Sequence, residues 1–218
     1  MGPARGLMAA FSLMTDLHSV TAAYDRYARI YDRLFGWVLH DGRLRLARRL
    51  QGAAGCKIVE FGVGSGLMLP LYPRQAQVLG LDVSAGMLDR ARQLAAREGL
   101  SNVRLQQVDA EHNGIADGSF DHVVLPYVYS VTPEPQALMA EAFRVCRPGG
   151  DIWILNHFSG LGFWDWLERP LRPFARWVGW RPDFPYDVHV TRQGWQIVDV
   201  ESANLWGLSR LVHVRKPL

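Results

Sequence analysis

The sequence predicts an α/β fold built on a doubly wound sheet of seven strands, mostly parallel with an antiparallel edge at the C-terminal end. From residue 56 onward, short apolar runs alternate with segments of helical periodicity, which indicates parallel strands covered by helices on both faces. The first run ends in three alternating glycines, Gly62, Gly64 and Gly66. The last two runs, around 195–200 and 208–214, predict a closing antiparallel pair.

The chain length and composition suit one globular domain. The 218 residues are 49% hydrophobic and 21% charged, and the formal net charge of +3 permits an anionic partner without demanding one. We expect an N-terminal helical extension over residues 1–50 and one domain over 51–218, with an aromatic helical insertion at about 161–186. The two cysteines have no metal-ligand spacing, so we expect no metal, and no apolar run approaches the ~18 residues of a membrane span.

The first two predicted strands end in turns suited to ligand binding. Strand 57–61 runs into the glycine turn, where the absence of side chains lets a ligand approach the main chain closely. Strand 78–81 closes in Asp82, twenty positions beyond Gly62. An acidic residue at this place can accept hydrogen bonds from both ribose hydroxyls of an adenosine.

The next helix and strand continue this pattern. A helix over 84–98 follows Asp82, with Ser84 as its N-cap and Met87 facing the cleft. Strand 103–108 ends in Asp109, whose carboxylate can accept a hydrogen bond from an adenine amine or can simply cap a turn.

Two further strands complete the parallel part of the sheet. Strand 121–125 leads into an aromatic turn, and a helix follows that ends at about residue 146. Residues 147–150 read as a sharp turn into strand 151–155, which ends in Asn156, His157 and Phe158.

Two aromatic segments lie outside these elements. Tyr24, Tyr27 and Tyr31 share one face of a predicted helix, and they either pack on the sheet or cap the cleft. Residues 161–186 interleave aromatic side chains with arginines and hold half of the eight tryptophans. This composition suits the headgroup layer of a membrane, a lid over an apolar ligand, or core packing. Residues 7–20 likewise form either an interfacial helix or one packed on the core.

The motifs together resemble a known enzyme family. The pattern E-x-G-x-G-x-G over Glu60–Gly66, with Asp82, Asp109 and the Arg147–Gly150 turn in order, is similar to that of class I S-adenosylmethionine (AdoMet) methyltransferases. The resemblance covers roughly residues 50–157 and implies a Rossmann-like fold with AdoMet as cofactor. It places the methionyl part of AdoMet at the glycine turn. The implied cofactor-binding residues are Glu60, Gly62, Gly64, Gly66, Asp82, Val83, Met87, Asp109, Ala110, Glu111 and Leu125.

A closer resemblance rests on other stretches. Residues 66–73, 126–135, 155–158 and 180–184 look like the bacterial phospholipid N-methyltransferases of the Rhodobacter type, while 24–32 resembles the first helix of quinone-methyltransferase-like enzymes. The resemblance implies stepwise methylation of phosphatidylethanolamine toward phosphatidylcholine. We therefore expect a monomeric, cytoplasmic protein bound peripherally to the inner face of the membrane. Its anionic surface would contact residues 1–20 and 161–186.

This reaction needs a neutral amine and an acceptor for its proton. His157 is the candidate base, although a hydrogen-bonded core histidine is an equal alternative; we name Tyr127 and Tyr24 with it as candidate catalytic residues. Tyrosines can also form an aromatic box for methylated ammonium groups. The candidate substrate-binding residues are Tyr27, Tyr31, Tyr129, Asn156 and Tyr186. The arginine that holds the lipid phosphate stays open.

The sequence leaves two other functions open. One is C-methylation of a quinone precursor, and another is an AdoMet-binding membrane module without turnover. Nucleic acid is not an expected partner, because the turn after the fourth strand reads Leu125-Pro126-Tyr127 and lacks the Asn or Asp typical of base-amine methyltransferases.

Overall fold

The computed structural model describes residues 38–159, 184–205 and 207–218. The chain divides into two units, Met1–His40 and Asp41–Leu218. Only the last three residues of the first unit are described, so the fold below is that of the second unit. The division falls at residue 40, whereas the sequence suggests a boundary near residue 50. The predictions for residues 1–20, for Tyr24, Tyr27 and Tyr31, and for most of 161–186 lie outside the described residues.

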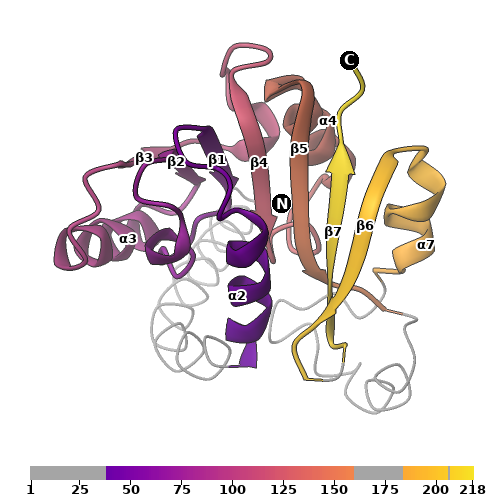
Figure 1. Ribbon diagram of the computed structural model, residues 1–218, viewed down its shortest axis with the longest axis horizontal. Coiled ribbons are helices and arrows are strands. Elements are labelled where there is room, and N and C mark those ends of the chain that lie inside the picture. Colours follow the sequence, from indigo (N-terminus) through magenta and orange to yellow (C-terminus); the bar gives the residue numbers. More distant parts are fainter. Residues whose placement is uncertain (1–37, 160–183, 206) are drawn as a thin grey trace, which may run out of the picture. The chain divides into compact units, whose positions relative to one another are not determined.

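The second unit is built on one seven-stranded sheet in the order β3-β2-β1-β4-β5-β7-β6 (Figure 1). The parallel strands are β1 (Lys57–Phe61), β2 (Gln77–Asp82), β3 (Val103–Gln107), β4 (Phe120–Pro126) and β5 (Cys146–His157). The antiparallel strands are β7 (Ser209–Arg215) and the edge strand β6 (Gln196–Ala203). The predicted fold class is therefore confirmed.

Helices connect the strands or flank them. The α-helices in the described ranges are α2 (His40–Arg49), α3 (Ala85–Arg97), α4 (Pro135–Val145) and the short α7 (Tyr186–His189). Short 3-10 helices span Leu69–Leu71, Ala110–His112 and Thr191–Gln193. None of the helices in the described part of the chain combines the length and apolarity that crossing a bilayer requires.

Two apolar clusters cover the two faces of the sheet. Successive residues of a strand point to opposite faces, so Ile58 and Val59 belong to different clusters. On the Ile58 face, α2 contributes Leu46 and Ala47, Leu50 follows directly after the helix, and α3 packs beside them. On the Val59 face lie α4 and the segment that contains α7. Helices on both faces make the sheet doubly wound.

The start of β5 differs from its prediction. Residues 147–150 were expected to form a turn before the strand, yet β5 already begins at Cys146, which pairs with Phe120. The register then shifts before His122 pairs with Asp151, and Gly149 adopts a φ of 68°. The glycines thus form an irregular stretch within the strand, because pairing with β4 starts before them.

The topology fixes the place for a ligand. From β1 the chain proceeds through β2 to β3 on one side, and β4 and β5 lie on the other side of β1. The crevice outside the carboxyl ends of β1 and β4 is the switch point at which doubly wound sheets bind ligands.

Candidate active site

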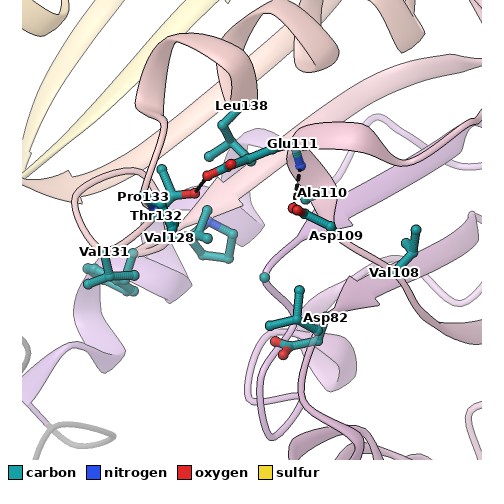
Figure 2. A pocket seen from close by; sticks show the side chains of 14 residues that line it. Asp82, Val108, Asp109, Ala110, Glu111, Val128, Val131, Thr132, Pro133 and Leu138 are labelled. Atoms are coloured by element: carbon teal, nitrogen blue, oxygen red, sulfur yellow. Dashed lines mark hydrogen bonds between the residues drawn. The ribbon is translucent and has the colours of Figure 1, made fainter. Parts of the chain in front are cut away.

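A cavity of about 360 Å³ lies at the carboxyl ends of β1 to β4 (Figure 2). This volume falls in the range of small-molecule sites. The lining residues come from four strand ends and α4: Gly62, Asp82, Val83, Val108, Asp109, Ala110, Glu111, Pro126, Tyr127, Val128, Val131, Thr132, Pro133 and Leu138. In Figure 2, Asp82 and Asp109 lie on one side, and Val131 and Thr132 lie opposite them.

The glycine turn follows β1, and its first glycine, Gly62, lines the cavity. Gly62, Gly64 and Gly66 have φ values of 67°, 54° and 84°, a region that favours glycine. A Cβ on Gly62 would lie 2.6 Å from Val128 Cγ2, so this glycine allows close packing against the loop after β4. A Cβ on Gly64 would meet nothing within 4 Å. The turn therefore keeps open space above Gly64, as a cofactor that approaches the backbone requires.

Asp82 links the glycine turn to α3. Its Oδ2 accepts a hydrogen bond of 2.8 Å from Gly64 N, and its Oδ1 accepts one of 2.9 Å from Ser84 N. Ser84 is the N-cap of α3, as predicted, and its hydroxyl accepts from Met87 N at 3.3 Å. Two backbone donors hold the Asp82 carboxylate in one orientation at the cavity wall.

Asp109 and Glu111 line the same cavity with different partners. Asp109 is exposed, and its Oδ1 accepts from Glu111 N at 2.9 Å. Glu111 is buried, and its Oε1 accepts from the Thr132 hydroxyl and, at 2.9 Å, from Glu134 N. Glu111 thus fastens the loop after β4 to the end of β3, while the Asp109 carboxylate remains accessible from the cavity.

Glu60 lies outside the cavity lining. Its side chain is 1% exposed, and its Oε2 accepts a 2.9 Å hydrogen bond from the Tyr72 hydroxyl. Burial raises the pKa of Glu60 to about 8, since desolvation disfavours the carboxylate. The structure therefore places this predicted cofactor residue in the interior below the glycine turn.

Four other predicted cofactor residues also lie away from the cavity lining: Gly64, Gly66, Met87 and Leu125. Leu125 is fully buried within β4, and the lining takes up the next residues of the chain, Pro126 and Tyr127. Met87 is half-buried in the first turn of α3. By contrast, Val83 and Ala110 line the cavity, as the resemblance implies.

Tyr127 lines the cavity in an unusual conformation. Its φ of 64° is rare for an aromatic residue. Its hydroxyl accepts a 2.9 Å hydrogen bond from Asn204 Nδ2, and the Arg43 guanidinium lies 5.3 Å from the ring centre. Burial raises the pKa of Tyr127 to about 12, so the phenol stays protonated near neutral pH.

Tyr129 and Asn156 are not available to a substrate in this structure. Tyr129 is fully buried, and its hydroxyl donates to His189 O at 3.1 Å. The Asn156 side chain is also fully buried and accepts at 3.4 Å from Ser130 N. These polar groups are satisfied inside the protein, as buried polar groups generally are, and the predicted contacts of both residues with a substrate stay predictions.

His157 and Tyr186 lie near the end of β5. His157 Nδ1 lies 2.6 Å from Leu208 O, and since a carbonyl only accepts, Nδ1 carries the proton. Tyr186 packs edge-on against Phe158, with ring centres 5.3 Å apart. Neither residue belongs to the cavity lining.

Val128, Thr132 and Asn204 are not among the residues predicted from the sequence, yet all three lie at the cavity or contact its wall. Val128 and Thr132 line the cavity because the loop after β4 folds back over Gly62. Asn204 lies 77 positions from its partner Tyr127. No local pattern marks such a contact.

These features fit AdoMet. The open space above Gly64 can take a chain with polar ends, and the fixed Asp82 carboxylate can accept from a ribose. Asp109 stands beside the apolar residues Val83 and Val108, which suits a flat base with an exocyclic amine.

Comparisons with known proteins agree with this geometry. A family model described as a methyltransferase domain matches residues 59–154. The phosphatidylethanolamine N-methyltransferase of Cereibacter sphaeroides is 42% identical over 171 residues, which cover 78% of this chain and 83% of that protein. The demethylmenaquinone methyltransferase of Thermobifida fusca is 29% identical over 171 residues, covering 76% and 68%.

A solved structure shows the same fold. An AdoMet-dependent methyltransferase from Aquifex aeolicus superposes with a TM-score of 0.60 at 17% identity and covers 79% of this chain and 88% of its own. The chain therefore belongs to the class I AdoMet-dependent methyltransferases, in the group that includes the Cereibacter enzyme, and AdoMet is its cofactor.

Proposed function

We propose that the protein methylates the amine of phosphatidylethanolamine, and of its mono- and dimethyl forms, toward phosphatidylcholine at a membrane surface. The observation that carries this proposal is the 42% identity to the Cereibacter enzyme over 83% of that protein's length. The aromatic and arginine-rich composition of residues 161–186 supports it, since such segments suit the headgroup layer. The proposed location is the inner face of the cytoplasmic membrane, with residues 1–20 and 161–186 as the contacts.

The chemistry defines what the residues must do. When bound, AdoMet supplies a methyl group on a positively charged sulfur. The headgroup amine has a lysine-like pKa of ~10 and arrives protonated, so a group of the protein or the exclusion of water must free its lone pair. Alignment of the amine with the methyl group can contribute ~7–11 kcal/mol. Tyr127, at the cavity wall, is the described aromatic residue best placed for this alignment.

His157 is the proposed proton acceptor. The Leu208 carbonyl accepts from its Nδ1–H, so the proposal assigns the transferred proton to Nε2. In the sheet, His157 pairs with Ser209, whose hydroxyl shares the Asn204 amide with Tyr127. The test is the pH profile of kcat for wild type and His157→Asn. We expect the limb at low pH to disappear and kcat to fall about 100-fold; an unchanged profile would remove His157 from the mechanism.

A second candidate function rests on the similarity to the Thermobifida enzyme. In that case the acceptor is a carbon of a demethylated quinone, and the base acts on a phenol. A third outcome is binding of AdoMet and membrane without turnover.

One assay separates these functions. The full chain is incubated with methyl-labelled AdoMet and liposomes that contain either phosphatidylethanolamine or a demethylated quinone. We expect label in the mono-, di- and trimethylated headgroups. Label in the quinone alone would favour the second function, and no label despite AdoMet binding would favour the module without turnover.

A further inference from the structure

We propose that Asn204 is a positioning residue for the methyl acceptor, because it fixes Tyr127 at the cavity wall and ties α2 to it. The role of the acceptor in this inference rests on the proposed function. The contacts themselves join three segments of the chain: the start of α2, the end of β4 and the turn between β6 and β7.

Asn204 has a conformation that suits an anchor. It is 2% exposed, lies directly after β6 and adopts a φ of 55°. Asparagine is among the few residues that adopt this left-handed region without a large steric cost. The backbone therefore presents the side chain to the interior at a fixed angle.

Both ends of the Asn204 amide are used. Its Oδ1 accepts a 2.7 Å hydrogen bond from Gly42 N. Its Nδ2 donates to the Tyr127 hydroxyl and to the Ser209 hydroxyl, each at 2.9 Å. Its backbone N–H donates to Asp41 Oδ2 at 3.2 Å. One buried amide thus connects the helix, the cavity wall and β7.

Tyr127 depends on such an anchor. Its left-handed φ is costly for an aromatic residue and persists only where the surroundings impose it. Leu155 O holds the backbone, accepting from Tyr127 N at 2.6 Å, and Asn204 holds the far end of the side chain. The ring between these two points lines the cavity. Loss of the Asn204 amide would remove this hydrogen bond from the Tyr127 hydroxyl.

Gly42 shows how closely α2 approaches this unit. A Cβ at Gly42 would overlap the Tyr127 hydroxyl and would lie 2.9 Å from Asn204 Nδ2. The next residue, Arg43, places its guanidinium 5.3 Å from the Tyr127 ring centre. Asn204 therefore sets the distance between α2 and the cavity wall as well as the orientation of the ring.

The test uses Asn204→Gly, which removes the side chain but tolerates the backbone conformation. The matched control is Asn102→Gly, since the Asn102 amide also clamps main-chain carbonyls, those of Pro73 and Ala76, away from the cavity. We measure kcat and KM for the lipid amine, the Kd for AdoMet and the thermal midpoint. For Asn204→Gly we expect kcat to fall about 10- to 100-fold with the AdoMet Kd nearly unchanged. We expect Asn102→Gly to lower only the thermal midpoint.

A double-mutant cycle with Tyr127→Phe distinguishes positioning from general destabilisation. Because both changes break the same hydrogen bond, we expect the double variant to lose much less kcat than the product of the single losses. An unchanged kcat and KM in folded Asn204→Gly, or fully multiplicative losses, would overturn the inference.

Failure of the proposed function gives a different result from failure of the Asn204 inference. A wild type that methylates only the quinone precursor contradicts the lipid substrate, and the same variants are then measured with the quinone. A wild type that transfers no methyl group to either acceptor overturns both proposals.

Discussion

At the scale of single residues, Asp82 shows how the site is held in place. Its two carboxylate oxygens accept from Gly64 N and Ser84 N, so one side chain fixes the glycine turn and the start of α3. The same carboxylate lines the cavity. Its geometry is therefore set by the protein, which lowers the cost of ordering it around a ligand.

Asp82→Asn should weaken AdoMet binding. An amide nitrogen cannot accept a hydrogen bond, so a charge-assisted bond worth about 1.5–3 kcal/mol is lost. This corresponds to a Kd about 10- to 100-fold higher, measured by calorimetry. The matched control is Asp89→Asn, an exposed carboxylate on α3 paired with Arg92, which should leave the Kd unchanged. Equal affinity of both variants would contradict this role.

Glu60 should make stability depend on pH. Burial raises its pKa to about 8, so the folded state binds a proton more tightly than the unfolded state. The contribution is complete below the ordinary carboxyl pKa of ~4.3 and is lost as the pH rises through 8. The free energy of unfolding should thus fall between pH 5 and 8, by up to about 1.4 kcal/mol per unit.

Denaturant unfolding over this range measures the effect. Glu60→Gln should flatten the dependence, while Glu98→Gln at the exposed end of α3 should leave it unchanged. A wild-type slope that persists in Glu60→Gln would assign the dependence to another group.

At the scale of elements, a comparison of two glycines can distinguish backbone strain from loss of cofactor binding. Gly64 and Gly99 have similar φ values, 54° and 62°, and a Cβ on either would meet no atom within 4 Å. They differ in place, since Gly64 lies two residues after the cavity-lining Gly62 and donates to Asp82, whereas Gly99 follows α3. Alanine at either site therefore costs a similar backbone strain.

Gly64→Ala should lose AdoMet affinity, whereas Gly99→Ala should not. Both variants should be destabilised by about 1 kcal/mol, because an L-residue is forced into the left-handed region. The Cβ at position 64 would fill open space on the turn that we propose seats the cofactor, and we expect a Kd at least about tenfold higher for this variant. Thermal unfolding and calorimetry on the two proteins provide the comparison. An equal Kd would show that the ligand does not approach Gly64.

Local signals predicted the elements well. The Ser84 cap, the glycine turn and the apolar runs depend on neighbouring residues, and the structure confirms the strands and helices that they indicate. The turn expected at 147–150 was wrong because pairing with β4 extends β5 to Cys146. Tyr129 was expected at the cleft, but its side chain is buried. It comes two residues after Tyr127, whose left-handed φ has no local signal in the sequence.

At the scale of the whole domain, the sheet order brings the predicted residues together. Asp82 ends β2, Asp109 follows β3 and Gly62 follows β1, so the parallel strands bring all three to one edge. This part of the site could be predicted because each residue follows a recognisable strand. The Asn204 anchor could not, since it depends on how the antiparallel β6–β7 pair returns to β5 and α2.

We propose that the protein transfers methyl groups from AdoMet in this cavity to a lipid amine. Mass spectrometry of the lipid headgroup tests this proposal most directly. Full-length wild type, Asp82→Asn and Asp89→Asn are each incubated with deuterated-methyl AdoMet and phosphatidylethanolamine liposomes at equal, limiting cofactor. We expect deuterated methyl groups on the headgroup nitrogen with wild type and Asp89→Asn, and at least about tenfold less with Asp82→Asn. If wild type binds AdoMet but no sample shows deuterium on the headgroup, the lipid amine is not the methyl acceptor.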